Sequence, residues 1–520
     1  MDGRLNLAVL GACALLLVAL LAVRLASRTA LPVLLVYLAL GMAVGQAGLG
    51  VRFSDYRLTA DLGLFALAVI LAEGGLTTPW SSVRPVLPFA IVLSTVGVGV
   101  SVAITATAAH LLLGIDVRTA VLLGGVVSST DAAAVFSVLR RLPLDRRIAA
   151  ALEAESGFND APVVILVTVA ASAGWGRTSI LAYAALLTYE LVAGAALGLL
   201  VGAVGRALLA RAALPAAGLY PLATVSLTLV AFTASNALHA SGFLAVYLTA
   251  LVLGNADLPH RRAVLGFAGS LALLAEAGLF LLLGLLAAPA RLPSSLPTAL
   301  VVGGVGTLLA RPVAVAVSAL PFRLPWRSQV FLSWAGLRGA VPIVLATIPV
   351  TNGIAGGTRI VDVVLVLVVV YTLAQAPTLP WIGRQLRVVE PGRLADLEVE
   401  VAPLEQVRAD LLGFTIPHGS RLAGVYAEEL RLPAGAHLTL VVRGAHSLVP
   451  DSATRLAVGD ALLVVATTEV RAAAEARRRD ISRRGKLADW LAEAVEVTDR
   501  ERRPLRERAR RRRGWDRYTH

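Results

Sequence analysis

Long apolar segments follow one another from residue 5 to residue 383. We count thirteen of them, near residues 5–23, 31–49, 60–79, 86–112, 117–139, 148–173, 178–205, 216–238, 241–256, 263–288, 296–320, 327–350 and 358–383. A helix of about 20 apolar residues crosses the hydrocarbon core of a bilayer. The pattern predicts an α-helical polytopic membrane protein with about thirteen transmembrane helices. An odd number of helices places the two ends of the chain on opposite sides of the membrane.

The composition agrees with this class of protein. Hydrophobic residues make up 57% of the 520 residues, charged residues make up 16%, and the mean hydropathy is +0.76. These values exclude an ordinary soluble protein of this length. The single cysteine, Cys13, excludes an internal disulfide and any thiolate metal site.

Arginines between the apolar segments predict the orientation. If the N-terminus lies outside, the predicted cytoplasmic loops hold thirteen arginines, whereas the predicted outer loops hold seven. Short cytoplasmic loops are enriched in basic residues. We therefore expect a multi-pass protein of the cell membrane with its N-terminus outside and its C-terminus in the cytoplasm.

The composition changes after Arg387. Acidic and turn residues come first, then short alternating segments that predict strands, and the net charge from Arg477 onward is +8, with sixteen basic and eight acidic residues. Beside a membrane, such a tail is expected to bind anionic lipid and not nucleic acid. We expect four parts: a membrane domain (1–388), a linker (389–400), a small soluble α+β domain (401–470) and a basic tail (471–520).

The sixth apolar segment contains a group of polar residues. Glu155, Ser156, Asn159 and Asp160 would form one stripe along a helix, because residues four apart share a face. Ionisable residues at membrane depth are costly and usually functional. Pro162 cannot donate to the carbonyl four residues earlier, which adds a free oxygen. These oxygens predict a site for a dehydrated alkali cation or a proton.

Two further apolar segments are interrupted by polar and glycine residues. The interruptions are residues 128–131 (Ser-Ser-Thr-Asp) and residues 336–342 (Gly-Leu-Arg-Gly-Ala-Val-Pro). They lie seven segments apart, so their segments cross the membrane in opposite directions. Paired interruptions of this kind are typical of transporters built from inverted repeats, with the binding site at the midplane.

Other charged residues near these segments are interpreted as a structural ion pair or as possible ligands, and two of them have two open interpretations. Arg338 needs an acidic partner, and Glu155 is the candidate, so that the pair would hold the broken segments together. Asp131 is as easily a helix-capping residue as a cation ligand. Glu73 either reaches the cation through water or lines the entrance.

The motifs together resemble those of a known family. Residues 155–160 (Glu-Ser-Gly-Phe-Asn-Asp), 129–131 (Ser-Thr-Asp) and 336–340 (Gly-Leu-Arg-Gly-Ala) resemble motifs of the monovalent cation:proton antiporters of the NhaP type. Residues 414–420 (Phe-Thr-Ile-Pro-His-Gly-Ser) and 430–433 (Leu-Arg-Leu-Pro) look like a TrkA-C domain, the C-terminal domain of regulators of potassium conductance. The combination resembles the potassium/proton, or cell volume regulation, branch.

The resemblance implies crossed broken helices, a homodimer and electroneutral one-for-one exchange. It implies cation ligation by Asp160, Ser156, Thr130 and Asp131 beside Asn159. It also implies water-mediated support from Glu73 and a structural ion pair between Glu155 and Arg338. No cofactor is expected beyond the transported K⁺ or Na⁺ and H⁺, although domains resembling the C-terminal one bind a small regulatory ligand.

The expected function is secondary active transport by alternating access and not enzymatic catalysis. Asp160 would hold either a cation or a proton, so that each is carried in one direction. A sodium or lithium antiporter of the same fold is an alternative, because these cations are also satisfied by oxygen. A ligand-gated potassium channel would need a carbonyl-lined filter, which the sequence lacks. A purely structural or sensory membrane protein would not need Asp160 and Asp131 at membrane depth.

Overall fold

The computed structural model describes residues 32–130, 144–389 and 400–477 with short gaps, together with part of residues 6–21. The short gaps are residues 47, 52, 178, 213, 405–408, 417–419, 421, 444–445, 468–469, 471–472 and 475–476. Asp131, most of the expected linker and nearly all of the expected basic tail lie outside the described residues. The chain forms two units, Met1–Val389 and Glu390–His520, and each is described by itself.

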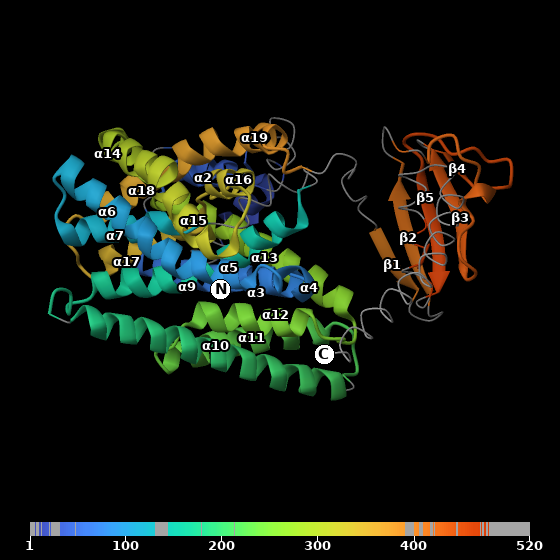
Figure 1. The fold of residues 1–520 in the computed structure, drawn as a ribbon, viewed down its shortest axis with the longest axis horizontal. Coiled ribbons are helices and arrows are strands. Elements are labelled where there is room, and N and C mark those ends of the chain that lie inside the picture. Colours follow the sequence, from blue (N-terminus) through green and yellow to red (C-terminus); the bar gives the residue numbers. More distant parts are fainter. Residues whose placement is uncertain are drawn as a thin grey trace, which may run out of the picture. The chain divides into compact units, whose positions relative to one another are not determined.

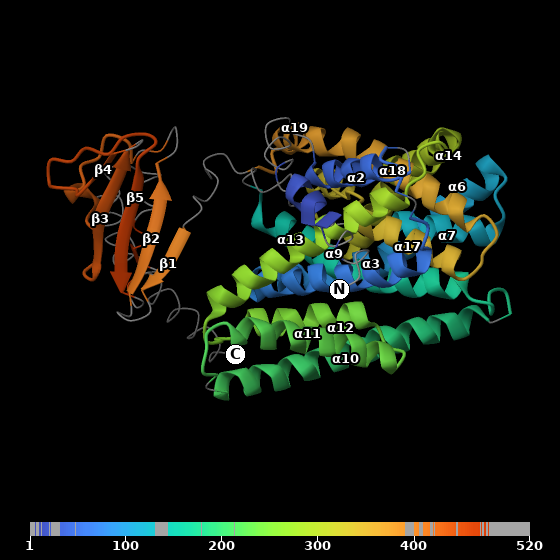
Figure 2. The same cartoon turned by 180° about the vertical axis from the view of Figure 1, so that it is seen from behind.

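One group of helices in the first unit, here called the scaffold helices, is built around α12. α12 packs against α3, α10 and α11, and α13 packs against α2 and α3. Figures 1 and 2 both show α10, α11 and α12 side by side along one edge of the unit. The scaffold helices are α2 (Val33–Val44), α3 (Tyr56–Thr77), α10 (Ile180–Arg211), α11 (Leu219–Ala237), α12 (Gly242–Gly254) and α13 (Arg261–Leu286).

Glycines allow α10 and α12 to approach closely. A Cβ atom on Gly194 would lie 2.6 Å from the carbonyl oxygen of Ser241, and one on Gly198 would lie 2.7 Å from the Cα atom of Ala245. Both distances are shorter than van der Waals contact. The two helices therefore approach to a distance that any larger residue at these positions would prevent.

The second group, here called the site helices, surrounds α9. α9 contacts α5, α7 and α17, and α7 packs against α6 and α17. The site helices are α4 (Trp80–Val83), α5 (Leu87–Val92), η1 (Leu93–Gly97), α6 (Val98–Leu113), α7 (Val117–Ser128), α9 (Arg146–Ala171), α14 (Leu292–Val305), η2 (Gly306–Ala310), α15 (Arg311–Ala319), η3 (Leu320–Phe322), α16 (Trp326–Trp334), α17 (Ala340–Thr351), α18 (Gly357–Gln375), η4 (Ala376–Thr378) and α19 (Leu379–Gln385).

The helical membrane fold is confirmed, and each predicted apolar segment contains helix in its described residues. Seven helical segments of the described chain are long and apolar enough to cross a membrane, beginning with Tyr56–Thr77. Some helix ends differ from the predicted ones because a capping residue determines where the helix begins. α3 starts at Tyr56 because the carboxylate of Asp55 accepts a hydrogen bond from the backbone N–H of Leu58 at 2.9 Å. Cys13, in the first segment, is exposed.

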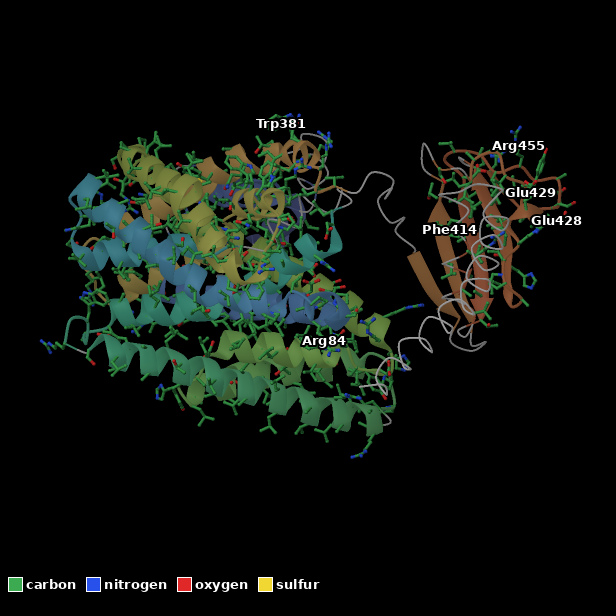
Figure 3. The ribbon with its side chains drawn as sticks, in the orientation of Figure 1. Arg84, Trp381, Phe414, Glu428, Glu429 and Arg455 are labelled. Atoms are coloured by element: carbon green, nitrogen blue, oxygen red, sulfur yellow. The ribbon has the colours of Figure 1, made fainter. Side chains whose placement is uncertain are left out.

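The second unit contains a five-stranded sheet with the order β1-β2-β5-β3-β4, in which neighbouring strands are antiparallel. The strands are β1 (Glu400–Leu404), β2 (Ala409–Thr415), β3 (Ala436–Arg443), β4 (His446–Leu448) and β5 (Ala461–Thr467), with a short helix, η5 (Glu428–Leu430). Alternate residues of β5 are buried, as expected for a strand with one face on a core. Phe414 of β2 belongs to that core, whereas Glu428, Glu429 and Arg455 lie together on one side of the domain (Figure 3).

An ion pair supports the turn before β5. Arg443 donates from Nε and Nη2 to the two carboxylate oxygens of Asp460, each at 2.7 Å, and Asp460 also accepts from the backbone N–H of Ala457 at 2.7 Å. The Asp460 side chain is fully buried, and the hydrogen-bonded Arg443 guanidinium holds the pKa of its carboxyl below the ordinary value.

Candidate functional site

The polar stripe of the sixth segment lies on α9 and is buried. The exposed fraction is 1% for Glu155, 6% for Ser156, 0% for Asn159 and 4% for Asp160. α9 begins after Asp145, whose carboxylate accepts from the backbone N–H of Arg147 at 2.7 Å, and it continues through Pro162 without ending. The helical spacing therefore places four polar side chains inside the membrane unit.

The first predicted interruption brings backbone and hydroxyl oxygens to this stripe. α7 ends at Ser128, and Ser129 is extended, with φ −67° and ψ 138°. The Ser129 hydroxyl donates to Oδ1 of Asp160 at 3.1 Å. Ser156 donates to the Thr130 carbonyl at 2.9 Å, and Asn159 donates from Nδ2 to the Thr130 hydroxyl at 2.6 Å. The end of helix α7 therefore meets the stripe at Thr130.

One polar atom at this meeting point lacks a protein partner. The Oδ1 atom of Asn159 is buried and accepts no hydrogen bond from any described residue. A buried acceptor without a donor is unfavourable in a stable structure unless another group compensates for it. The atom is therefore available to a cation or a water molecule.

The second predicted interruption separates α16 from α17 and reaches the same place. α16 ends at Trp334, and α17 begins at Ala340. A Cβ atom on Gly336 would lie 3.4 Å from Cγ2 of Thr130 and 2.8 Å from Nε of Arg311. The two broken segments thus meet, as the inverted-repeat interpretation predicts, and glycine leaves the room for this contact.

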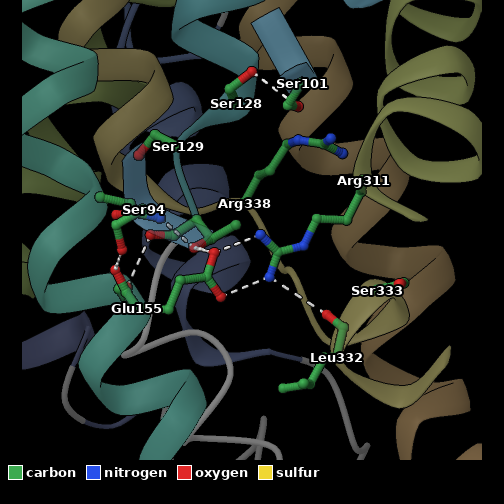
Figure 4. A network of polar contacts seen from close by, with 12 residues as sticks. Ser94, Ser101, Ser128, Ser129, Glu155, Arg311, Leu332, Ser333 and Arg338 are labelled. Carbon is green, nitrogen blue, oxygen red and sulfur yellow. Dashed lines mark hydrogen bonds and ion pairs between the residues drawn. The ribbon is translucent and has the colours of Figure 1, made fainter. Parts of the chain in front are cut away.

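The predicted ion pair between Glu155 and Arg338 is wrong, because Glu155 pairs with Arg311. Arg311 donates from Nη1 to Oε1 of Glu155 and from Nη2 to Oε2 at 2.6 Å (Figure 4). The exposed fraction is 2% for the Glu155 side chain and 10% for that of Arg311. Arg311 is the first residue of α15, which brings its guanidinium opposite Glu155.

Arg338 has other partners. Its Nε donates to the carbonyl oxygen of Val127 at 2.7 Å, and its Nη1 donates to the hydroxyl of Thr307 at 2.6 Å. Val127 lies in the last turn of α7, where carbonyl groups lack helical partners and a positive charge is favoured. The C-terminal end of α7 therefore compensates part of the positive charge of Arg338, a role that the sequence interpretation assigned to a carboxylate.

The sequence interpretation missed Arg311, although an arginine within an apolar segment is visible in the sequence. It lies within an apolar segment, and Pro312 follows it. An arginine in a membrane span needs compensation as much as Arg338 does. Two arginines and one nearby glutamate made the pairing ambiguous, and the sequence could not show which helix faces Glu155.

Glu73 is not one of the partners described above for Thr130. Glu73 lies on α3 and lines a cavity of about 10 Å³ between α3, α11 and α13, together with Thr228 and Ala268. A cavity of this size is near the lower limit for holding one water molecule. Asp131, the other predicted carboxylate, lies outside the described residues.

The fold and site define a class of membrane protein in which two interrupted helices meet beside a buried carboxylate, as in inverted-repeat transporters. The chain belongs to the sodium/hydrogen exchanger family: the model described as "Sodium/hydrogen exchanger, transmembrane" matches residues 14–385. A second model, the TrkA-C domain, matches residues 411–477. Both parts of the resemblance seen in the sequence are therefore confirmed.

Relatives cover most of the chain. A protein named K(+)/H(+) antiporter NhaP from Alkalimonas amylolytica is 33% identical over 89% of this chain and 81% of its own length. K(+)/H(+) antiporter NhaP2 from Shewanella oneidensis is 34% identical over 84% of this chain and 77% of its own length. Na(+)/H(+) antiporter NhaS2 from Synechocystis is 29% identical over 73% of this chain and 71% of its own length.

A solved structure has the same fold. The sodium proton antiporter MjNhaP1 from Methanocaldococcus jannaschii superposes with a TM-score of 0.64 at 20% sequence identity. The match covers 76% of this chain and 100% of that chain. At this identity the similarity concerns the fold of the membrane unit.

Proposed function

We propose that this protein is a monovalent cation/proton antiporter, a secondary active transporter, and that potassium is its cation. The observation that carries the proposal is the contact of the broken end of α7 with the polar stripe of α9. Ser129 bonds to the buried carboxylate of Asp160, and Thr130 bonds to Ser156 and Asn159. All of these groups offer oxygen atoms, which suit hard cations such as K⁺ and Na⁺. The names of the Alkalimonas and Shewanella relatives, which are 33% and 34% identical to this chain, support potassium.

Asp160 is the group for which cation and proton compete. Its carboxylate is 4% exposed, so its charge needs compensation by a cation or neutralisation by a proton. Ser129 donates to one of its oxygens. Asn159, the preceding residue of α9, holds the Thr130 hydroxyl. When a cation binds to these oxygens the proton leaves, and when the proton returns the cation is released.

The remaining predicted ligands complete this proposal. Asp131 follows Thr130 in the chain and would add a second carboxylate or further backbone oxygens. Glu73 would support the cation through water. Asn159 stands where a second carboxylate would add another exchanged charge, which fits one-for-one electroneutral exchange.

Alternating access is the proposed transport mechanism, and the division of the membrane unit into two groups of helices supports it. The site helices carry the broken segments and α9, and they would move against the scaffold helices to expose Asp160 to either side. Packing between the groups includes α9 against α12 and α17 against α3. Motion at these contacts would carry the bound ion or proton across the membrane.

The assembly is proposed to be a homodimer in the cell membrane, with the N-terminus outside and the C-terminus in the cytoplasm. The excess of arginine in the predicted cytoplasmic loops supports this orientation. α10 supports an intermolecular contact, because only 22% of its apolar span is buried within the chain. Its exposed face contains a groove of about 710 Å³ that is lined by residues such as Leu181 and Val192.

The test is proton flux in proteoliposomes, reported by a pH-sensitive dye, with K⁺, Na⁺, Li⁺ and Rb⁺ offered in turn. Asp160→Asn keeps the size of the side chain and removes its charge, so we expect exchange to be lost. Glu190→Gln on α10, which changes another membrane carboxylate far from Thr130 in the helix order, is the matched control and should retain exchange. Flux near the wild-type rate in Asp160→Asn would overturn the assignment.

The cation series separates potassium from sodium. A potassium antiporter dissipates a pH gradient when K⁺ is added and responds less to Na⁺ and Li⁺. The sodium alternative is favoured by the name of the Synechocystis relative and predicts the reverse order. Lack of response to every monovalent cation in a folded, reconstituted protein would contradict both.

A further inference from the structure

Two membrane segments each contain one turn of π-helix. η1 (Leu93–Gly97) lies between α5 and α6, and η2 (Gly306–Ala310) lies between α14 and α15. A π-turn widens a helix locally and is frequent at functional sites. The segments are the fourth and the eleventh of those predicted from the sequence. They are therefore seven apart, the same offset that separates the two broken segments.

Each π-turn directs a buried hydroxyl toward the site. Ser94 of η1 is 1% exposed and donates to the backbone carbonyl of Glu155 at 3.1 Å. Thr307 of η2 is 3% exposed and accepts from Nη1 of Arg338 at 2.6 Å. η1 also contacts α15, and η2 contacts α6, so the two π-turns lie across each other's segments.

The Ser94 contact acts on the helix that carries Asp160. The carbonyl of Glu155 would normally bond to the N–H of Asn159, one residue before Asp160. A hydroxyl from a neighbouring segment therefore fixes α9 within about one and a half turns of the carboxylate, at a distance along the helix axis of roughly 7.5 Å.

The Thr307 contact acts on the end of α7. Arg338 is 5% exposed, and its hydrogen-bond acceptors in the described part of the chain are the carbonyl of Val127 and the hydroxyl of Thr307. The Val127 carbonyl precedes Thr130 by three residues. A Cβ atom on Gly306 would lie 2.9 Å from Nη2 of Arg338, so the π-turn backbone also confines the guanidinium.

We propose that Ser94 and Thr307 are positioning residues of the cation site, acting from the two π-turns on its two sides. Ser94 fixes the helix that carries Asp160, and Thr307 fixes Arg338 and, through it, the end of α7 and the oxygens of Thr130. The inference rests on the cation site proposed above. It gives the fourth and eleventh segments, which contain none of the predicted ligands, a role in positioning the cation site.

The central variant is Thr307→Val, which removes the hydroxyl with little change of volume, and Thr307→Ser restores a hydroxyl. Ser94→Ala tests the other side. Two matched controls lie in the same segments: Thr105→Val on α6 and Ser318→Ala on α15 remove buried hydroxyls that have no hydrogen-bond partner in the described part of the chain. The apparent KM for K⁺ and the maximal rate are measured in proteoliposomes at several pH values.

Thr307→Val should raise the apparent KM for K⁺ roughly 10-fold, because it removes a hydrogen bond to a charged group. Ser94→Ala should raise it roughly 3-fold to 5-fold, because its hydrogen bond joins neutral groups. Thr307→Ser and both controls should stay within about 2-fold of wild type, since a change of 2-fold corresponds to less than 0.5 kcal/mol.

The pH profile provides a readout that a merely structural role would not move. If cation binding weakens while Asp160 still binds protons, protons win the competition up to a higher pH. At a fixed, subsaturating K⁺ concentration the acid limb of the flux profile should therefore move toward alkaline pH in Thr307→Val. A lower maximal rate with unchanged KM and pH profile would overturn the positioning role, as would equal KM changes in the controls.

Asp160→Asn, measured alongside, separates the two proposals. If Asp160→Asn is active, the proposed cation site fails and the positioning role fails with it. If Asp160→Asn is inactive while Thr307→Val and Ser94→Ala match wild type in KM and pH profile, only the positioning role fails. Melting curves of each purified variant identify one that is merely unfolded, and Thr307→Ser then decides whether the hydroxyl itself is required.

Discussion

Arginine forks hold the buried carboxylates of Asp460 in the soluble unit and Glu155 in the membrane unit, and these two pairs differ in how exposed the arginine is. Arg443 of the soluble unit has an exposed side-chain fraction of 48%, whereas Arg311 of the membrane unit has 10%. A half-exposed arginine keeps part of its hydration when its partner is lost. A buried one depends on its partner, so the membrane pair is retained or lost as a unit.

The largest effect is expected from breaking the membrane pair on one side. Glu155→Gln or Arg311→Met alone leaves a buried charge without its partner, at a cost on the order of 3–5 kcal/mol. Each single variant should unfold at a lower temperature in detergent and yield less folded protein. The double variant should recover part of the loss.

A second double-mutant cycle tests which of the two arginines pairs with Glu155. Glu155→Gln combined with Arg338→Met should give additive losses, because Arg338 contacts Val127 and Thr307 and does not pair with Glu155. If this second cycle shows the coupling and the Arg311 cycle is additive, the pairing seen in the structure is not the one that stabilises the protein.

A smaller effect is expected at the soluble pair. Asp460→Asn removes a charged acceptor that holds Arg443 and the backbone N–H of Ala457, at a cost of roughly 1.5–3 kcal/mol. The measurement is pulsed hydrogen exchange at increasing urea concentration. It gives the urea concentration at which half of the molecules have lost protection of the β2 and β5 amides. Asp451→Asn, at an exposed carboxylate, is the control and should change the midpoint little.

The same pair gives a pH dependence with a defined sign. Because Arg443 lowers the pKa of folded Asp460, the carboxylate stabilises the domain above the pKa of the unfolded chain, which is about 3.9. The stability difference between wild type and Asp460→Asn should be complete at neutral pH. It should shrink as the pH falls below about 4 and vanish below the lowered pKa of the folded domain. A difference that is independent of pH would show that the charge of Asp460 is not responsible.

The smallest effect on exchange is expected from removing the soluble unit altogether. The oxygens around Asp160 lie wholly in the first unit, so a chain ending after residue 392 should still exchange cations for protons. If the TrkA-C domain biases one state of the membrane unit, the pH profile of flux should shift. A chain ending after residue 470, which lacks only the tail, is the control. Complete loss of flux in a folded truncation would make the domain part of the transport machinery.

The predictable part of the site was local in sequence. The spacing of Glu155, Ser156, Asn159 and Asp160 follows directly from helix geometry, and the polar interruption at residues 128–131 marked the end of α7. The fold followed from apolar length and from motif order. Likewise, alternation in β5 was visible because one face of the strand is buried.

The unpredictable part was the contact between distant segments. Arg311 and Arg338 are both arginines in apolar surroundings, and only the crossing of α15 with α9 determines which one meets Glu155. The π-turns have no sequence signal comparable to a broken segment. Ser94 and Thr307 look like ordinary hydroxyl residues in membrane helices, which usually bond to their own backbone.

The exposed Cys13 provides a single site for attaching a spectroscopic label. Because the sequence contains one cysteine, a thiol-specific spin label attaches at a single position in the unaltered protein. A symmetric pair of labelled chains then has one interspin distance, whereas separate chains in dilute detergent have none. Cys13→Ser supplies a cysteine-free background into which a second thiol can be placed on any helix, so that opening and closing become measurable as changes in distance.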